Sequence, residues 1–156
     1  MRKGLCLVLS VILLLSFTAC AQEDTTKEIS LQSVIDGALA SGGFQDDLMK
    51  LEGDAVTVFY NIDSSKVKDY EIYVSSSGAT SEEVAVFELR NKDDAEAVKK
   101  MIDSRIDDLS FKFESYKPEE MYKIKNALIQ QTEQYILFVV ADEPELTKAV
   151  FSNAFK

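Results

Sequence analysis

The sequence predicts an α+β fold: a two-layer sandwich with a mainly antiparallel sheet, built from two hairpin–helix units and an extra N-terminal helix. The composition is that of a globular domain, because 46% of the 156 residues are hydrophobic and 28% are charged. Two pairs of short apolar segments are joined by loops, as in β-hairpins. A segment with helical periodicity follows each pair, so the two units are expected over residues 70–115 and 127–155.

The first expected element is a helix over residues 30–41, which ends at Gly42-Gly43. Its apolar residues recur at helical spacing: Leu31, Val34, Ile35, Ala38 and Leu39. Residues 55–60 leave two interpretations open. Their β-branched and aromatic side chains favour a strand, but periodicity cannot separate so short an apolar run from a buried helix.

The first hairpin is expected from residues 70–74 and 83–89, joined by a loop of small residues around Gly78. Asn91 is placed to cap the long helix that follows. The apolar positions of this helix step by three or four residues: Ala95, Val98, Met101, Ile102, Ile106, Leu109, Phe113 and Tyr116. This stripe predicts a helix that packs on the sheet.

A short helix over residues 119–125 is expected to begin after Pro118. The second hairpin comprises residues 127–131 and 135–141, which turn at residues 132–134. Asp142 is placed to cap a final helix from Pro144 to about Phe155. The side chains expected to face inward are Leu146, Ala149, Val150 and Ala154.

Residues 1–19 are typical of a signal peptide. Arg2 and Lys3 precede an uncharged apolar run from Gly4 to Ser16. Thirteen helical residues would rise about 20 Å, less than the roughly 30 Å of a bilayer's hydrocarbon core. The pattern therefore predicts a secretory signal rather than a spanning helix. The alternative, a buried N-terminal helix, would show polar positions on one face.

The segment Phe17-Thr18-Ala19-Cys20 resembles the lipobox of bacterial lipoproteins, with Phe17 in the place of the usual Leu. The resemblance implies cleavage before Cys20 and lipid attachment to its sulfur, through acyl chains such as palmitate. Two or more chains anchor a protein stably. Residues 20–28 would then be the lipidated cysteine and a short polar tether, and residues 29–156 a single domain. The alternative is ordinary secretion without a lipid.

The acidic balance argues against nucleic acid as a partner. The chain has 17 Lys and Arg against 27 Asp and Glu, a net charge of −10. Such a surface repels phosphate backbones and anionic headgroups, so membrane contact is expected through the lipid on Cys20. The sequence contains no His, which excludes Ser-His-Asp catalysis and imidazole metal sites. No cofactor or metal site is expected.

Two other patterns contain potential catalytic groups. The loop over residues 75–81 holds accessible serines, but a serine needs a base, and we interpret it as an ordinary flexible hairpin loop. Acidic doublets such as Asp46-Asp47, Glu82-Glu83 and Glu119-Glu120 are interpreted as solvated faces and helix N-termini. A glycosidase would need two carboxyls that face each other across a cleft.

The corner between the long and short helices is the candidate partner-binding surface. Tyr116 and Tyr122 lie on either side of Pro118 and Glu119, and Tyr is enriched in protein interfaces. A structural role competes with this interpretation, because Tyr116 also completes the apolar stripe and Pro118 begins a helix.

From about Ile29 to Phe155, the chain resembles a family of small bacterial lipoproteins, the domain of unknown function DUF4358. The resemblance is carried by Tyr60-Asn61-Ile62-Asp63, Tyr70, Gly78 with residues 83–87, Ser115-Tyr116 with Pro118-Glu119, and Tyr135. It implies that residues 55–60 form a short helix. It also implies a Gly in the second hairpin turn, where this chain has Thr132-Glu133-Gln134. The resemblance brings no reaction, cofactor or site.

The expected function is therefore that of a lipid-anchored, extracytoplasmic envelope protein, held at the cell membrane through Cys20. A non-enzymatic domain that binds a protein or cell-wall component is favoured. The alternatives are a small carboxylate-based hydrolase of the cell envelope and a solute-binding lipoprotein. A deep apolar pocket with a few converging polar groups would favour the last of these.

Overall fold

The computed structural model describes residues 27–156. The signal peptide, Cys20 and most of the tether lie outside the described residues. The helices are α1 (Leu31–Ala40), α2 (Asp54–Tyr60), α3 (Ala95–Tyr116), α4 (Met121–Lys125) and α5 (Pro144–Ala154), with short 3-10 turns at Lys92–Asp94 and Pro118–Glu120. The strands are β1 (Leu48–Lys50), β2 (Val67–Ser75), β3 (Glu83–Leu89), β4 (Leu128–Thr132) and β5 (Tyr135–Val140).

The five strands form one antiparallel sheet in the order β1-β2-β3-β5-β4. Both predicted hairpins, β2–β3 and β4–β5, are present, and β3 pairs with β5 at the centre. Their register places Glu83 opposite Val140 and Glu88 opposite Tyr135. Since α3 follows the first hairpin and α5 the second, the two hairpin–helix units and the extra N-terminal helix α1 are confirmed.

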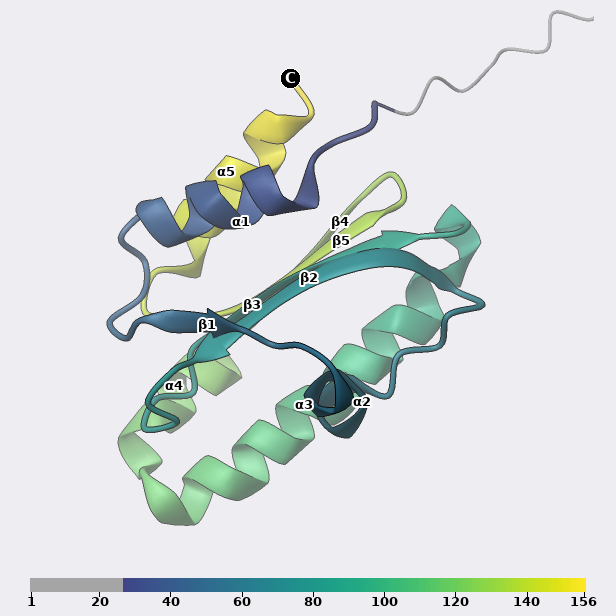
Figure 1. Cartoon of the computed structure of the whole chain (residues 1–156). Coiled ribbons are helices and arrows are strands. Elements are labelled where there is room, and N and C mark those ends of the chain that lie inside the picture. The colour runs from purple at the N-terminus through teal and green to yellow at the C-terminus, as the bar shows by residue number, and fades with distance from the viewer. Residues whose placement is uncertain (1–26) are drawn as a thin grey trace, which may run out of the picture.

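Helices cover both faces of this sheet (Figure 1), so the α+β class is confirmed but the layers number three rather than two. The reason is the composition of β3 and β5, whose residues are all buried. Phe87 and Phe138 point into the core beneath α2, α3 and α4, whereas Val86 and Leu137 point into the core beneath α1 and α5. Strands that are apolar on both faces must be covered on both faces.

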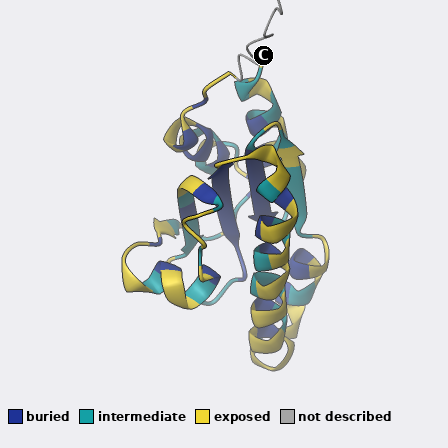
Figure 2. Ribbon diagram, turned by 90° about the vertical axis from the view of Figure 1, so that its right-hand side faces the viewer, coloured by how far each residue is buried: buried dark blue, intermediate teal, exposed yellow. Residues whose placement is uncertain are grey.

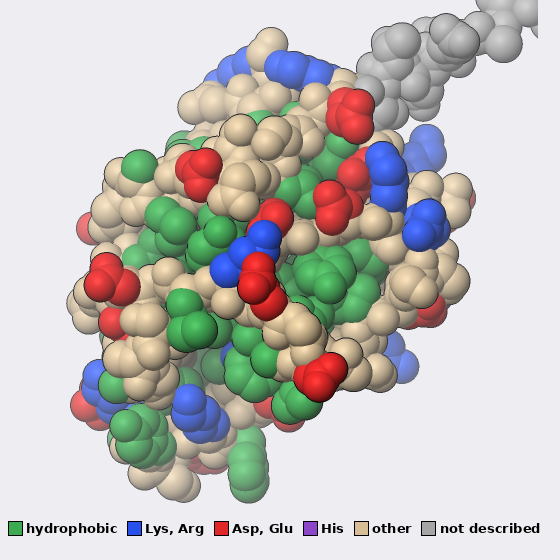
Figure 3. All heavy atoms as spheres, in the orientation of Figure 1, with side chains coloured by type: hydrophobic (Ala, Val, Ile, Leu, Met, Phe, Trp, Pro, Cys, Tyr) green, Lys and Arg blue, Asp and Glu red, His purple; other side chains and the backbone are tan. Residues whose placement is uncertain are grey.

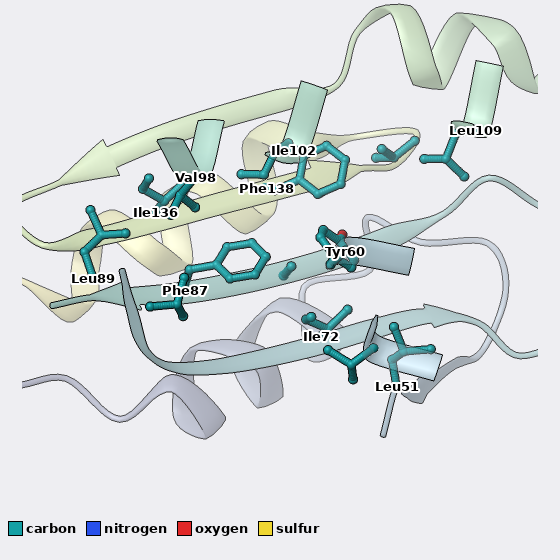
Figure 4. Close-up of a cluster of buried hydrophobic side chains, with 14 of the residues drawn as sticks. Leu51, Tyr60, Ile72, Phe87, Leu89, Val98, Ile102, Leu109, Ile136 and Phe138 are labelled. Atoms are coloured by element: carbon teal, nitrogen blue, oxygen red, sulfur yellow. The ribbon is translucent and has the colours of Figure 1, made fainter. Parts of the chain in front are cut away.

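Figure 2 shows the consequence for burial: the central strands are buried between helices whose outward faces are exposed. Figure 4 shows side chains from α2, β2, β3, β5 and α3 that converge in the first core. Tyr60 and Phe87 lie within it, with ring centroids 5.6 Å apart. The apolar stripe predicted for α3 is confirmed at Val98, Ile102, Leu109 and Phe113, which are buried, but Tyr116 at its end is 61% exposed.

The segment whose conformation the sequence left open is helical. In α2, Val56 and Tyr60 lie one turn apart and are both buried, so tertiary packing overrides the strand propensity. The helix ends at Tyr60, and the C-cap residue Asn61 has a left-handed backbone with φ 45°. Sequence analysis did not predict β1, a three-residue strand that has no alternating pattern of its own and pairs with residues 73–75 of β2.

Two details of α5 differ from the prediction. Asp142 does not cap the helix, because Glu143 occupies the N-cap position and no side-chain capping bond forms. The buried face of α5 is formed by Thr147 and Phe151, whereas Leu146 and Ala149 are exposed. The ring of Phe151 is fully buried in the core beneath α1 and α5, and it lies 5.1 Å from the ring of Phe155. At α1, Ser30 is the N-cap, and its hydroxyl accepts a hydrogen bond from the Ser33 N–H.

The described chain enters the fold at one end of the sheet. The Ile29 N–H donates to the Tyr135 hydroxyl, and Tyr135 pairs with Glu88. Glu83 is at the other end of β3, about 17 Å away at the usual strand rise, next to the loop that joins β2 to β3. Among residues 27–156, no helix has both the length and the apolar character that a bilayer crossing requires.

Candidate ligand-binding cleft

A cavity of about 520 Å³ lies between β1, α2, α3 and the loop over residues 76–82 that joins β2 to β3. Its apolar wall is formed by Met49, Leu51, Phe59, Val74, Leu109 and Phe113. Its polar lining includes Glu83 and Arg105, together with serines of the loop and Lys112 at the rim. We call this cavity the cleft. Its size and its mixture of apolar walls with a few polar groups are typical of small-molecule sites.

Arg105 and Glu83 form an ion pair on the floor of the cleft. Arg105 comes from α3 and Glu83 from the first residue of β3. Arg105 Nη2 lies 2.7 Å and Nε 3.1 Å from Glu83 Oε2. The guanidinium also lies over the Phe59 ring, 4.4 Å from its centroid. Because the Glu83 side chain is 1% and the Arg105 side chain 11% exposed, the ion pair is largely shielded from solvent.

Tyr60 is buried beside this ion pair and does not line the cleft, and its hydroxyl donates a hydrogen bond to Glu83 Oε1. Burial, followed by the negative charge of Glu83, raises the pKa of the Tyr60 hydroxyl well above its ordinary value. Burial acts to lower the pKa of Arg105, but the charge and hydrogen bonds of Glu83, together with the nearby Tyr60 and Asp108, outweigh it and the net direction is upward. Tyr60 therefore stays protonated and Arg105 stays charged.

A second buried ion cluster lies behind the cleft. Lys123 of α4 is 1% exposed, and its Nζ lies 2.9 Å from Glu82 Oε1 and 3.3 Å from Glu120 Oε2. The Glu82 carboxylate also accepts hydrogen bonds from the Gln45 and Asp46 N–H groups. The cluster thus ties α4, the start of β3 and the segment before β1 to one another.

The pKa values of Glu120 and Asp142, two acids of this cluster, are shifted in opposite directions. Burial acts to raise the pKa of Glu120, but the Ser81 N–H and the charge of Lys123 outweigh it and hold this pKa below its ordinary value. Burial, followed by the charges of Glu82 and Glu120, raises the pKa of Asp142. Asp142 Oδ1 lies 3.7 Å from Lys123 Nζ and has no hydrogen-bond partner among the described residues.

The serine loop at the mouth of the cleft is held on two sides by side chains from other parts of the chain. The Asp46 carboxylate accepts hydrogen bonds from the Ser75 and Ser77 hydroxyls, and these bonds lower the pKa of Asp46. From α3, Lys112 Nζ donates to the Gly78 carbonyl at 3.2 Å. Gly78 has φ 65°, a left-handed conformation in which a side chain would be strained. The mouth of the cleft is therefore preformed.

The acidic doublets divide between surface and interior. Asp107, Asp108 and Glu119 are exposed, as expected. Glu82 and Glu83 are each 1% exposed and Glu120 is 3% exposed, so the interpretation as solvated faces is wrong for these residues. Each is instead paired with a buried or half-buried cation. Within residues 27–156, no group of three or more potential metal ligands is found.

The four residues of the candidate partner surface lie outside the cleft lining. Tyr116 ends α3, Pro118 and Glu119 form the connecting 3-10 turn, and Tyr122 lies on α4. All four are exposed, and Tyr116 contacts Phe113 edge-on with ring centroids 6.0 Å apart. Figure 3 shows hydrophobic side chains at the surface near the lower end of the molecule, where α3 ends.

Sequence analysis missed Arg105, Glu83, Tyr60 and Lys123. One signal was available for Arg105, which lies three residues after Ile102 and four before Leu109 and so falls on the buried stripe of α3. A charged residue on an apolar stripe needs a buried partner. Only the fold shows that this partner is Glu83.

Comparison with known proteins identifies a family but no function. The model of a domain of unknown function, DUF4358, matches residues 40–141, which include the cleft and both hairpins. Neither a curated protein nor a solved structure matches the chain. The match covers more than half of the sequence and includes all five strands, α2, α3 and α4. The chain therefore belongs to the DUF4358 family.

Proposed function

We propose that this protein is a lipid-anchored, extracytoplasmic envelope protein that binds a ligand in the cleft and catalyses no reaction. The cleft carries the proposal: a preformed cavity of about 520 Å³ with apolar walls and an ion-paired floor. Such a cavity is the feature that favours solute binding over a purely structural domain. The lipid anchor is supported by the signal pattern and the lipobox that ends at Cys20.

The placement of the cleft fits this proposal. The described chain begins beside Tyr135, and the cleft lies beside Glu83 at the opposite end of β3. Figure 1 shows the same separation between the entry of the chain near α5 and the end of the sheet near β1 and α4. A lipid on Cys20 would hold the first end near the bilayer and leave the cleft facing away from it.

The hydrolase alternative is less well supported. The two buried carboxylates of the cleft, Glu82 and Glu83, are both occupied by hydrogen bonds from Lys123, Arg105, Tyr60 and main-chain N–H groups. The third carboxylate of the lining, Asp108, is exposed, so the cleft offers no pair of buried, free carboxyls. Glycoside hydrolysis needs one protonated carboxyl and one free carboxylate that face the substrate. The exposed corner of Tyr116, Pro118, Glu119 and Tyr122 remains a candidate contact for an envelope protein or cell-wall component.

Native mass spectrometry of the protein gently extracted from its own membrane tests this proposal. We expect a mass of residues 20–156 plus acyl chains, together with an additional bound species. Met49→Glu places a charge on the apolar wall at a side chain that is already 53% exposed, so the fold is expected to tolerate it. Phe111→Glu is the matched control, because Phe111 is 86% exposed on α3 and does not line the cleft.

The bound species should be lost from Met49→Glu and kept by Phe111→Glu. Equal retention by both variants would refute the cleft as the binding site. A mass without acyl chains, or one that begins at another residue, would refute the lipid anchor independently of the ligand.

A further inference from the structure

The guanidinium of Arg105 is only partly used by the protein. Its hydrogen bonds to Glu83 come from Nε and Nη2. Within the described part of the chain, Nη1 donates no hydrogen bond. Arg105 lines the cleft, and both Glu83 and the Phe59 ring hold it in place. It therefore presents oriented donors, whose position is fixed before a ligand arrives.

The floor offers donors and lacks free acceptors. Both oxygens of Glu83 are occupied, by Arg105 and by the Tyr60 hydroxyl. Glu82 is occupied by Lys123 and by two main-chain N–H groups. An ammonium group that reached the floor would find both buried carboxylates occupied, and the third carboxylate of the lining, Asp108, is exposed on α3. A ligand with acceptor oxygens could instead accept hydrogen bonds from the N–H groups of Arg105 that do not bind Glu83.

Charge and shape narrow the class of acceptor. The ionised side chains that line the cleft are Glu82, Glu83, Asp108, Arg105 and Lys112, a formal balance of −1. This balance repels a phosphate dianion more strongly than a carboxylate, which carries one charge and has two coplanar oxygens that match a guanidinium. The six apolar side chains of the wall require a ligand whose remaining atoms are largely apolar.

We propose that the cleft binds a monocarboxylate with an apolar body, and that the free donors of Arg105 anchor the carboxylate. The inference rests on the proposed function, because it names the ligand class of the same site. Either a free acylated amino acid or the C-terminal residue of a peptide would supply this chemistry. The two sources share an apolar side chain next to a terminal carboxylate.

Titration of the ¹⁵N-labelled full chain in detergent micelles, followed by NMR, tests the ligand class. The probes are N-acetyl-L-leucine, its methyl ester, and a tripeptide that ends in leucine. The ester keeps the apolar body and removes the charge. We expect the acid to shift the amide signals of residues 76–83 and 105–113, and the ester to bind at least tenfold more weakly. Tighter binding of the tripeptide than of the acid would identify a peptide end as the source.

Arg105→Lys provides the matching change in the protein, because it keeps a cation beside Glu83 but removes the guanidinium N–H groups that do not bind Glu83. We expect at least tenfold weaker binding of the acid. Arg90→Lys is the control, since Arg90 is exposed, donates to the Ser64 carbonyl and does not line the cleft. The comparison of acid and ester uses the unaltered chain, so it stands even where Arg105→Lys disturbs folding.

Two results would overturn the inference. Equal binding of acid and ester would refute the carboxylate while leaving the cleft as a binding site. In the second, no probe shifts the amide signals, although native mass spectrometry still detects a bound species that Met49→Glu removes. This result would refute the ligand class but not the proposed function. If that species is absent as well, both proposals fail.

Discussion

Replacement of Lys123 by Met tests whether the buried ion cluster holds the fold together. Met is similar in length and apolar, so packing around the side chain is largely kept while the charge is lost. Glu82 and Glu120, whose side chains are 0% and 4% exposed, would then lose the cation at 2.9 Å and 3.3 Å. Removal of one partner of a buried pair costs roughly 3–5 kcal/mol, because the remaining charge stays buried.

The lower part of that range is expected here. Glu82 would keep its hydrogen bonds from the Gln45 and Asp46 N–H groups, and Glu120 would keep those from Ser81. We predict a loss of about 3 kcal/mol in the free energy of unfolding. With an m-value of about 2 kcal/mol/M, the urea midpoint should fall by roughly 1.5 M.

Urea unfolding of the full chain, monitored by far-UV circular dichroism, measures this difference. The control is Lys148→Met, which removes an ion pair of similar length, 2.8 Å to Glu145, whose side chains are 43% and 70% exposed. An exposed pair of this kind contributes less than about 0.5 kcal/mol. If Lys123→Met cost less than about 1 kcal/mol, or no more than the control, the reasoning would be refuted.

Three further predictions concern single positions. Because the folded-state pKa of Asp142 is raised, its ionisation destabilises the fold at neutral pH. Asp142→Asn should therefore stabilise by about 0.5–1 kcal/mol at pH 7 and lose this benefit below about pH 4, where the unfolded state also binds the proton; a benefit independent of pH in urea titrations would contradict this. Glu133 has φ 52° in the β4–β5 turn, so Glu133→Gly should raise stability by about 1 kcal/mol, and an unchanged thermal midpoint would count against backbone strain. A Cβ at Gly37 would lie 2.7 Å from Val150 Cγ1 across the contact of α1 with α5. Gly37→Ala should therefore lower the free energy of unfolding by roughly 1–2 kcal/mol, and Val150→Ala in the same chain should recover most of this loss. No recovery in the double variant would contradict the steric explanation.

Most of the fold could be predicted because its elements carry local signals. The alternation of residues 70–74, the stripe of α3 and Pro118 each depend on near neighbours in the sequence. The conformation of residues 55–60 could not be derived from propensity, because the burial of Tyr60 against Phe87 decides it. For the same reason β1 was missed: three residues form a strand only where β2 is available to pair with them.

The site was far less predictable than the fold. Arg105 and Glu83 are 22 residues apart and meet only when α3 packs on the sheet. Glu82-Glu83 looked like one more acidic doublet, yet both side chains are buried because cations from α3 and α4 neutralise them. Composition alone cannot show which acids of an acidic protein are paired. The Gly implied at the second turn is replaced by Glu133, which adopts a backbone conformation suited to Gly.

The most direct test of the cleft as the ligand site is a crystal structure of the protein purified from its own membrane, from a sample whose native mass includes the bound species. The account predicts a molecule between α3 and the loop over residues 76–82, with an acceptor oxygen about 3 Å from Arg105 Nη1. A molecule seated elsewhere on the domain, or an empty cleft in such a sample, would contradict it.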